Sequence, residues 1–161
     1  MKLTEFLKTV AEDEYVYLGA LSCYLWIGHP AEILEKLPSL DEDYTERLRD
    51  SIERNAWVIK DLKNQMSKND KLISKGKDVD GLKRVNKRLA KELARQEKRK
   101  VELTEWLENR VPFGEREVKD VYRRRIVNPV GTVVIIEGNE IGDYWMLSEI
   151  ENGEGVRELT E

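Results

Sequence analysis

The sequence predicts an α+β protein in which a small antiparallel sheet, built from both ends of the chain, carries an inserted helical hairpin. Three observations favour this fold class. Two long amphipathic helical patterns occupy residues 39–110, a turn-rich stretch separates them, and runs of β-branched and aromatic residues lie on either side. We therefore expect a head made of residues 1–38 and 111–161, and a coiled-coil hairpin arm made of residues 39–110.

The two helical patterns match each other when the chain folds back at Ser74–Gly81. Apolar residues recur about every 3.5 positions, which is typical of a coiled-coil seam. If facing residues have numbers that add up to 155, one register accounts for the whole seam. It pairs Leu48 with Leu107, Ile52 with Leu103, Leu62 with Leu93, Met66 with Leu89 and Ile73 with Leu82.

Polar residues interrupt this predicted seam. The same register places Asn69 opposite Asn86, and Ile59 opposite Gln96. Buried polar residues of this kind cost stability but fix the alignment of the two helices.

The N-terminal part of the chain combines a short helix with two strands. Leu3 to Val10 have helical spacing, and residues 15–18 and 21–27 have strand character. Gly19-Ala20 between them suits a two-residue type II′ turn. In that register Leu18 faces Leu21 and Val16 faces Cys23.

Proline residues are expected to divide the next segment. Pro30, at a first helical position, begins a short helix of residues 30–36 that Pro38 ends. Ser39 and Glu42 then have the spacing of a capping box, which predicts that the first long helix begins there.

The C-terminal part reads as strands. Residues 118–127 and 132–137 flank a turn at Asn128–Gly131, and a last short strand is expected at residues 144–147. The run of residues 133–136 is apolar on both sides, which is typical of a central strand.

Composition limits the class of protein. Of the 161 residues, 37% are charged and 40% are hydrophobic, a balance typical of soluble, helix-rich proteins. No apolar run approaches the roughly 18 residues that span a bilayer, and the first residues lack the apolar core of a signal peptide. Cys23 is the single cysteine, so no intramolecular disulfide can form. We expect a cytoplasmic protein with no membrane contact.

Charge is distributed unevenly along the chain. Residues 60–100 hold 15 Lys/Arg and 6 Asp/Glu, a net charge of +9, whereas the rest holds 13 and 26, a net charge of −13. This division suggests a basic arm that meets an anionic partner.

No residue pattern indicates catalysis. His29 is the only histidine and has no serine or second cysteine placed to use it, so we interpret it as a polar residue at a strand-to-helix junction. Cys23 alternates with core aliphatic residues and is expected to be a small buried hydrophobe. No zinc spacing or nucleotide-binding loop occurs. The sequence predicts neither an enzyme nor a cofactor nor a metal site.

Two surfaces are candidates for binding. The first is the returning helix of the arm, where cations can follow phosphates or an acidic partner, although a solvated coiled-coil face is the open alternative. Its candidate residues are Lys83, Arg84, Lys87, Arg88, Lys91 and Arg95.

The second surface combines arginines with aromatic residues. Alternation along a strand sends Arg123 and Arg125 to one face and Arg124 to the other. With Tyr144 and Trp145, Arg123 and Arg125 can hold an anionic ligand or a partner. Pairing of the arginines with acidic residues of the head, and core packing of the aromatic residues, remain open.

Four blocks of the head resemble small accessory proteins carried by phages and prophages of Gram-positive bacteria. They are Leu3–Leu18, Trp26–Ile33, Glu117–Tyr122 and Val134–Trp145. Such proteins include inhibitors of host defence, among them anti-CRISPR proteins that occupy a nucleic-acid channel or hold an enzyme shut. The resemblance therefore implies a non-enzymatic protein that binds a host protein or nucleoprotein.

The residues leave three alternatives open. The chain can bind nucleic acid directly through the basic arm, or sequester a small nucleotide signal with Arg123, Arg125, Tyr144 and Trp145. It can also act structurally as a homodimer, if two hairpins join into a four-helix bundle.

Overall fold

The computed structural model describes residues 1–20, 23–124, 130–138, 140 and 141. It confirms the α+β class, with a long helix pair and a four-stranded sheet among the described residues. The elements in chain order are α1 (Leu3–Thr9), β1 (Val16–Ala20), β2 (Cys23–Gly28), α2 (Pro30–Ser74), α3 (Val79–Glu108), the 3-10 helix η1 (Phe113–Glu115), β3 (Val118–Arg123) and β4 (Thr132–Ile136).

Two compact units share these elements. One unit contains residues 1–45 and 110–161, and the other contains residues 46–109. The first holds the sheet with α1, η1 and the start of α2, and the second holds the rest of α2 with α3.

The sheet has the strand order β2-β1-β4-β3 and is mixed. β1 pairs antiparallel with β2, and β3 pairs antiparallel with β4, but β1 and β4 run parallel, with Leu18 opposite Val134. The prediction of an antiparallel sheet is therefore wrong for this central pair. The alternation of side chains is the same in both kinds of sheet, so it does not encode strand direction.

Both faces of the central strands are covered. Val133 and Val134 of β4 are fully buried on opposite faces, which confirms the prediction of a central strand there. On one face, Tyr17 and Val133 form a cluster against which Tyr15, Tyr122 and Ile135 pack. The helices and η1 add further buried side chains to the unit, namely Leu3, Leu7, Ile33, Leu37, Tyr44 and Phe113.

The turn predicted between the first two strands is wrong. Gly19 and Ala20 lie inside β1, and Ala20 pairs with Cys23, so the connection falls on residues 21–22, outside the described residues. The predicted pairs give way to Leu18 with Trp26 and Val16 with Gly28. A bulge between Leu18 and Gly19 shifts the register, and a glycine inside a strand often marks such a bulge.

The prediction of a separate short helix that ends before Pro38 is also wrong, and so is the prediction that the first long helix begins at Ser39. A single helix, α2, begins at Pro30 as predicted and contains Pro38 in its interior. An internal proline costs about 3 kcal/mol. A stripe at helical spacing passes straight through it, and each buried aliphatic side chain contributes about 1.5–3 kcal/mol. The stripe consists of Ile33, Leu37, Leu40, Tyr44 and Leu48, all buried, whereas Pro38 is exposed.

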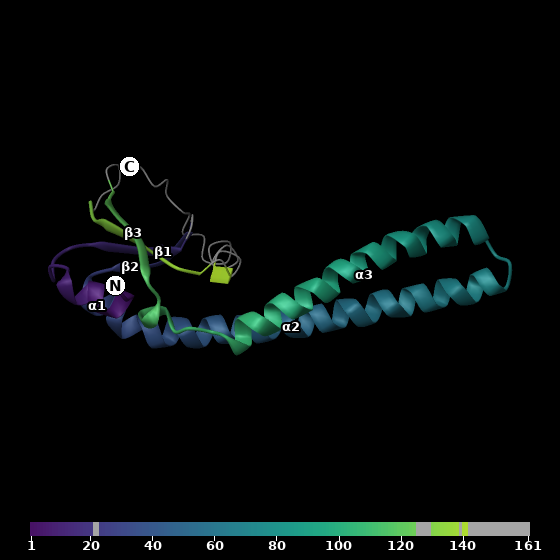
Figure 1. Cartoon of the computed structure of the whole chain (residues 1–161), viewed down its shortest axis with the longest axis horizontal. Coiled ribbons are helices and arrows are strands. Elements are labelled where there is room, and N and C mark those ends of the chain that lie inside the picture. The colour runs from purple at the N-terminus through teal and green to yellow at the C-terminus, as the bar shows by residue number, and fades with distance from the viewer. Residues whose placement is uncertain (21–22, 125–129, 139, 142–161) are drawn as a thin grey trace. The chain divides into compact units, whose positions relative to one another are not determined.

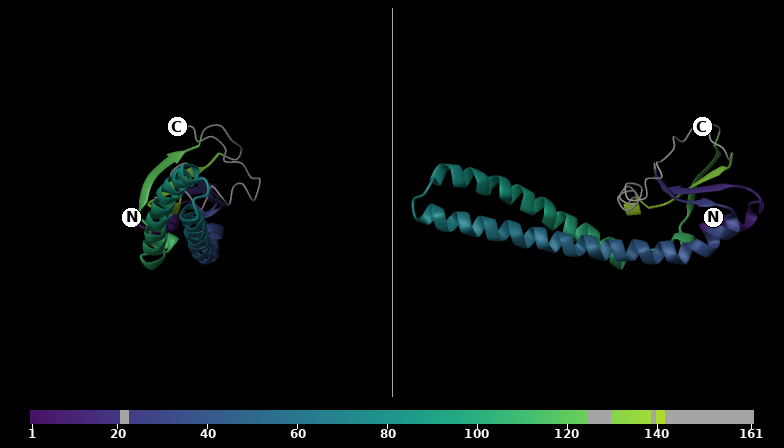
Figure 2. Two further views of the ribbon diagram at one scale, coloured as in Figure 1. Left: turned by 90° about the vertical axis from the view of Figure 1, so that its right-hand side faces the viewer. Right: turned by 180° about the vertical axis from the view of Figure 1, so that it is seen from behind.

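α2 and α3 lie side by side as an antiparallel hairpin (Figure 1 and Figure 2). Asn69 Nδ2 donates to Asn86 Oδ1 at 2.9 Å, which confirms that predicted pair. Gln96 is also reached from α2: Asn55 Nδ2 donates to its carbonyl oxygen at 3.0 Å and to its Oε1 at 3.1 Å. Ile59 and Leu62 are buried along the same seam.

The turn of the hairpin ends α2 with a left-handed glycine. Gly76 has φ 73°, and its N–H donates to Ile73 O at 2.9 Å. The N–H of Lys77 donates to Leu72 O at 3.1 Å. These two bonds form a Schellman motif, which satisfies carbonyl groups that the end of a helix leaves without partners.

The remaining strand predictions differ in extent. β4 coincides with the predicted strand apart from Glu137. β3 covers only the first part of residues 118–127, and residues 125–127 and the strand expected at 144–147 lie outside the described residues.

Candidate partner-binding surface

Seven cations occupy the outer face of α3, and we call them the basic row. Since an α-helix turns through 100° per residue, they fall within a sector of about 140° opposite the seam residues Leu82, Leu89 and Leu93. The row runs from residue 83 to residue 98, which is about 22 Å along the helix. Six of its members were candidates from the sequence, and all seven side chains are exposed. The members are Lys83, Arg84, Lys87, Arg88, Lys91, Arg95 and Lys98.

The two carboxylates of the same stretch, Glu92 and Glu97, lie just outside the two edges of the row. The carboxylate of Glu92 accepts hydrogen bonds from Gln96 Nε2 at 2.9 Å and from Arg95. Glu97 Oε1 lies 3.8 Å from Lys63 Nζ on α2. Both acids therefore sit on the flanks of α3, and Arg95, itself exposed, is the one member of the row with an ion pair among the described residues.

Most of the row is uncompensated. The side chains of Lys83, Lys87, Arg88 and Lys91 have no hydrogen bond or ion pair within the described part of the chain, and Arg84 Nε donates to Asp80 O at 3.3 Å. The arrangement holds several positive charges on one helix face at fixed spacing, and such a face can bind a polyanion.

Of the second predicted set, only Arg123 lies among the described residues. Arg123 lies at the end of β3, and its Nη1 donates to Glu14 Oε1 at 3.1 Å. The same oxygen accepts from Thr132 Oγ1 at 3.0 Å, so Arg123 is used within the head. Arg125, Tyr144 and Trp145 lie outside the described residues. The adjacent Arg124 is 1% exposed, with its guanidinium carbon 4.4 Å from the centre of the Tyr17 ring.

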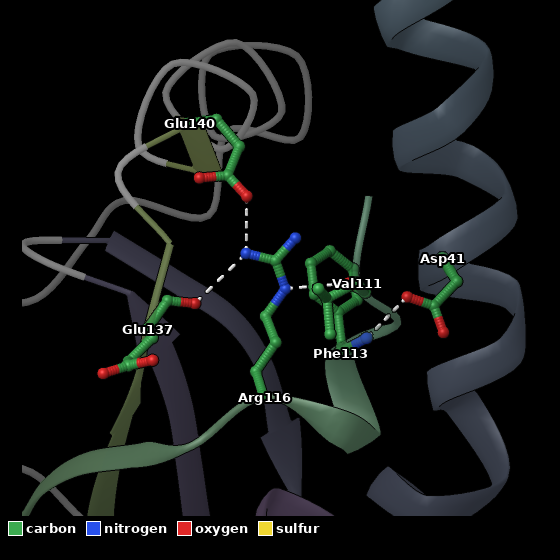
Figure 3. Close-up of polar contacts among 6 residues, drawn as sticks. All are labelled: Asp41, Val111, Phe113, Arg116, Glu137 and Glu140. Carbon is green, nitrogen blue, oxygen red and sulfur yellow. Dashed lines mark hydrogen bonds and ion pairs between the residues drawn. The ribbon is translucent and has the colours of Figure 1, made fainter. Parts of the chain in front are cut away.

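Arg116 is a second buried arginine, and sequence reasoning missed it (Figure 3). Its Nε donates to Val111 O at 2.9 Å, and its Nη1 donates to Glu137 O at 3.2 Å and to Glu140 Oε1 at 2.5 Å. Nothing in the local sequence marks this residue, because its partners come from segments on both sides of it, up to 24 residues away.

The cluster around Arg116 continues to α2. Asp41 Oδ1 accepts from the backbone N–H of Phe113 at 2.8 Å. Burial raises the pKa of the Asp41 carboxyl, although that hydrogen bond opposes the shift. The ring of Phe113 lies between Arg116 at 5.5 Å and Tyr44 at 5.5 Å. These contacts join η1, α2 and the end of β4, so we assign the cluster a structural role.

Comparisons of the chain with protein-family models, with curated proteins and with solved structures give no match.

His29 has a local role at the junction of β2 and α2. Its Nδ1 lies 3.1 Å from Glu14 O, and its ring meets Tyr15 edge-on at 5.2 Å. Its backbone N–H donates to Glu32 Oε2 at 3.3 Å, which helps to begin α2. Cys23 lies in β2.

The described residues hold no group of three or more His, Cys, Asp or Glu side chains placed to bind a metal ion. Within the same residues, no helix combines the length and apolar character needed to cross a membrane.

Proposed function

We propose that this chain is a non-enzymatic binding protein that attaches to an anionic macromolecule through the basic row of its helical hairpin. The supporting observation is that seven exposed cations share one helix face, and that among the described residues only Arg95 of the seven has an ion pair. Each exposed ion pair is worth only about 0–1 kcal/mol, but a polyanion engages many cations at once.

The resemblance of the head to phage accessory proteins supports a more specific role. In that role the protein acts in the cytoplasm of a host cell, and its target is a host nucleoprotein, such as a defence nuclease loaded with its nucleic acid. Inhibition then follows from occupying the target, in the manner of an anti-CRISPR protein, and needs no cofactor and no membrane.

The other functions have less support. The nucleotide-sequestering site requires Arg123 to be available, and Arg123 is bonded to Glu14. Nothing among the described residues favours a four-helix dimer over a single hairpin.

The test compares two variants with the same change in charge. The row variant, K83Q/K87Q/R88Q/K91Q, neutralises four members of the basic row whose side chains have no partner among the described residues. The control variant, K8Q/R49Q/R54Q/K119Q, neutralises four exposed cations outside residues 60–100. Both variants and the wild type are used for affinity capture from a host lysate, with and without nuclease treatment, and mixed with candidate nucleases, guide-loaded and empty.

We expect the wild type and the control variant to capture the same target and to inhibit the same nuclease. For the row variant, capture of the target and inhibition of the nuclease should each be at least tenfold weaker. Equal capture by all three proteins, or no capture and no inhibition by the wild type, would reject the proposed function.

A further inference from the structure

The basic row is divided into two lines. Lys83, Lys87 and Lys91 follow one another four residues apart, and Arg84, Arg88 and Arg95 run beside them. Both lines face solvent, and with Lys98 the whole row extends over about 22 Å of helix. A nucleic-acid duplex carries one charge for about every 1.7 Å of its axis, so a duplex segment as long as the row holds on the order of a dozen phosphates, of which those on the near side can face the row.

The row lacks what a protein partner requires. Protein interfaces derive most of their affinity from a few buried anchors, typically aromatic residues, and lysine is depleted in them. Between residues 83 and 98, Val85 is the only exposed large hydrophobic residue, at 41%, and there is no aromatic residue. Ion pairs with surface carboxylates would add little. Phosphates, by contrast, give affinity through the release of counterions.

The row also lacks what a single strand requires. Proteins that bind single strands combine a groove with aromatic side chains on which the bases stack. The outer face of a helix is convex, and the nearest tryptophans in the sequence, Trp57 and Trp106, lie outside the row. Trp106 is moreover covered by Arg99, whose guanidinium carbon lies 4.9 Å from the ring centre.

From these three observations we infer that the partner of the basic row is a nucleic-acid duplex, bound through its phosphates without regard to base sequence. This inference rests on the proposed function and specifies its partner. Lysines and arginines with no stacking residue between them recognise the charge and spacing of the phosphates and do not distinguish the bases.

The test measures binding of the full chain by fluorescence anisotropy between 50 and 300 mM NaCl. The labelled probes are 24-base-pair DNA duplexes of two unrelated sequences, an RNA duplex of the same length and the corresponding single strands. Polyglutamate, which presents carboxylates without phosphates, serves as competitor. Circular dichroism of the row and control variants checks that both are folded.

We expect one or both kinds of duplex to bind, with an affinity that does not depend on sequence and falls linearly with salt on logarithmic axes. The row variant should bind at least tenfold more weakly, and its salt slope should be smaller by about 3 to 4, one for each lost phosphate contact. The control variant should stay within twofold of the wild type.

Three results would overturn the inference. Single strands that bind as tightly as duplexes would assign the row to unpaired nucleic acid, and displacement by polyglutamate at equal charge would assign it to an acidic protein. If no nucleic acid binds while row-dependent capture from lysate persists, the duplex is rejected and the proposed function stands. If neither nucleic-acid binding nor row-dependent capture is found, the duplex and the proposed function are both rejected.

Discussion

At the scale of single residues, the head is stabilised by an arginine that is buried together with its carboxylate partner. The side chain of Arg116 is 6% exposed and that of Glu140 is 18% exposed, and the two lie 2.5 Å apart, so the pair is largely buried. Gly138 makes room for it: φ is 142°, and a Cβ atom there would lie 2.2 Å from Arg116 Nη1. Removing one partner of such a buried pair typically costs about 3–5 kcal/mol, because it leaves the other charge buried alone.

The ionisation of Tyr44 gives a pH prediction at this scale. Burial, and secondly the charge of Glu140, raise the pKa of its hydroxyl above the ordinary value. Because the unfolded chain releases this proton at a lower pH than the folded chain, the contribution of Tyr44 to the free energy of unfolding is complete below pH 10 and is lost as the pH rises further. The loss is at most about 1.4 kcal/mol per pH unit.

The measurement compares the wild type with Tyr44→Phe by urea unfolding. The difference in their free energies of unfolding should be constant from pH 7 to 9 and should then fall between pH 10 and 11, since phenylalanine has no proton to release. A difference that stays constant through pH 11 would show that Tyr44 does not control this dependence.

At the scale of the elements, the two helices of the hairpin are aligned by polar residues. Asn86 Oδ1 accepts from Asn69, and Asn86 Nδ2 donates to Asp70 Oδ1 at 2.9 Å. Asn86→Leu should destabilise the chain by about 1–2 kcal/mol, because it leaves the half-buried amide of Asn69 without its partner. The double substitution N69L/N86L should recover this loss, since leucines restore an apolar seam.

A double-mutant cycle by urea unfolding measures the coupling between Asn69 and Asn86. We expect a coupling free energy of about 1 kcal/mol or more. Strictly additive effects of the two single substitutions would mean that the pair does not align the helices.

The hairpin was the most predictable part of the fold, because its register depends on a local repeat. The pair Asn69–Asn86 follows from the position of the turn alone. The sheet was less predictable: the direction of β4 beside β1 leaves no trace in side-chain alternation, and Pro38 reads locally as a helix end. Its helix persists because burial of the stripe from Ile33 to Leu48 outweighs the proline.

The candidate site divides in the same way. The basic row could be predicted because it lies on one helix with a known repeat. The role of Arg116 could not be predicted, because its hydrogen bonds to the backbone carbonyl of Glu137 and to the carboxylate of Glu140 depend on the tertiary fold.

At the scale of the whole molecule, charge is segregated. Residues 60–100 carry +9 within a chain whose net charge is −4. Like charges four residues apart on a helix cost about 0.2–0.5 kcal/mol per pair, and the basic row contains several such pairs. Without a bound polyanion, repulsion within the basic row therefore destabilises the folded chain.

The row variant tests this cost without any ligand. Because glutamine and lysine have similar helix propensities, the substitutions should act mainly through charge. We expect the row variant to be more stable than the wild type by about 1 kcal/mol in 20 mM NaCl, and the difference to shrink in 500 mM NaCl, where charges are screened. Urea unfolding at the two salt concentrations measures it; a salt-independent difference would point to a cause other than repulsion.

The parallel pairing of β1 with β4 has a consequence for how the molecule is made. Tyr15 O accepts from Thr132 N at 2.8 Å, although more than a hundred residues separate the two in the chain. The hairpin, whose contacts are local at its turn, can form while the chain is still growing. β1 can pair with β4 only after the ribosome has delivered residues 132–136, so the sheet is completed only after the whole hairpin has been synthesised.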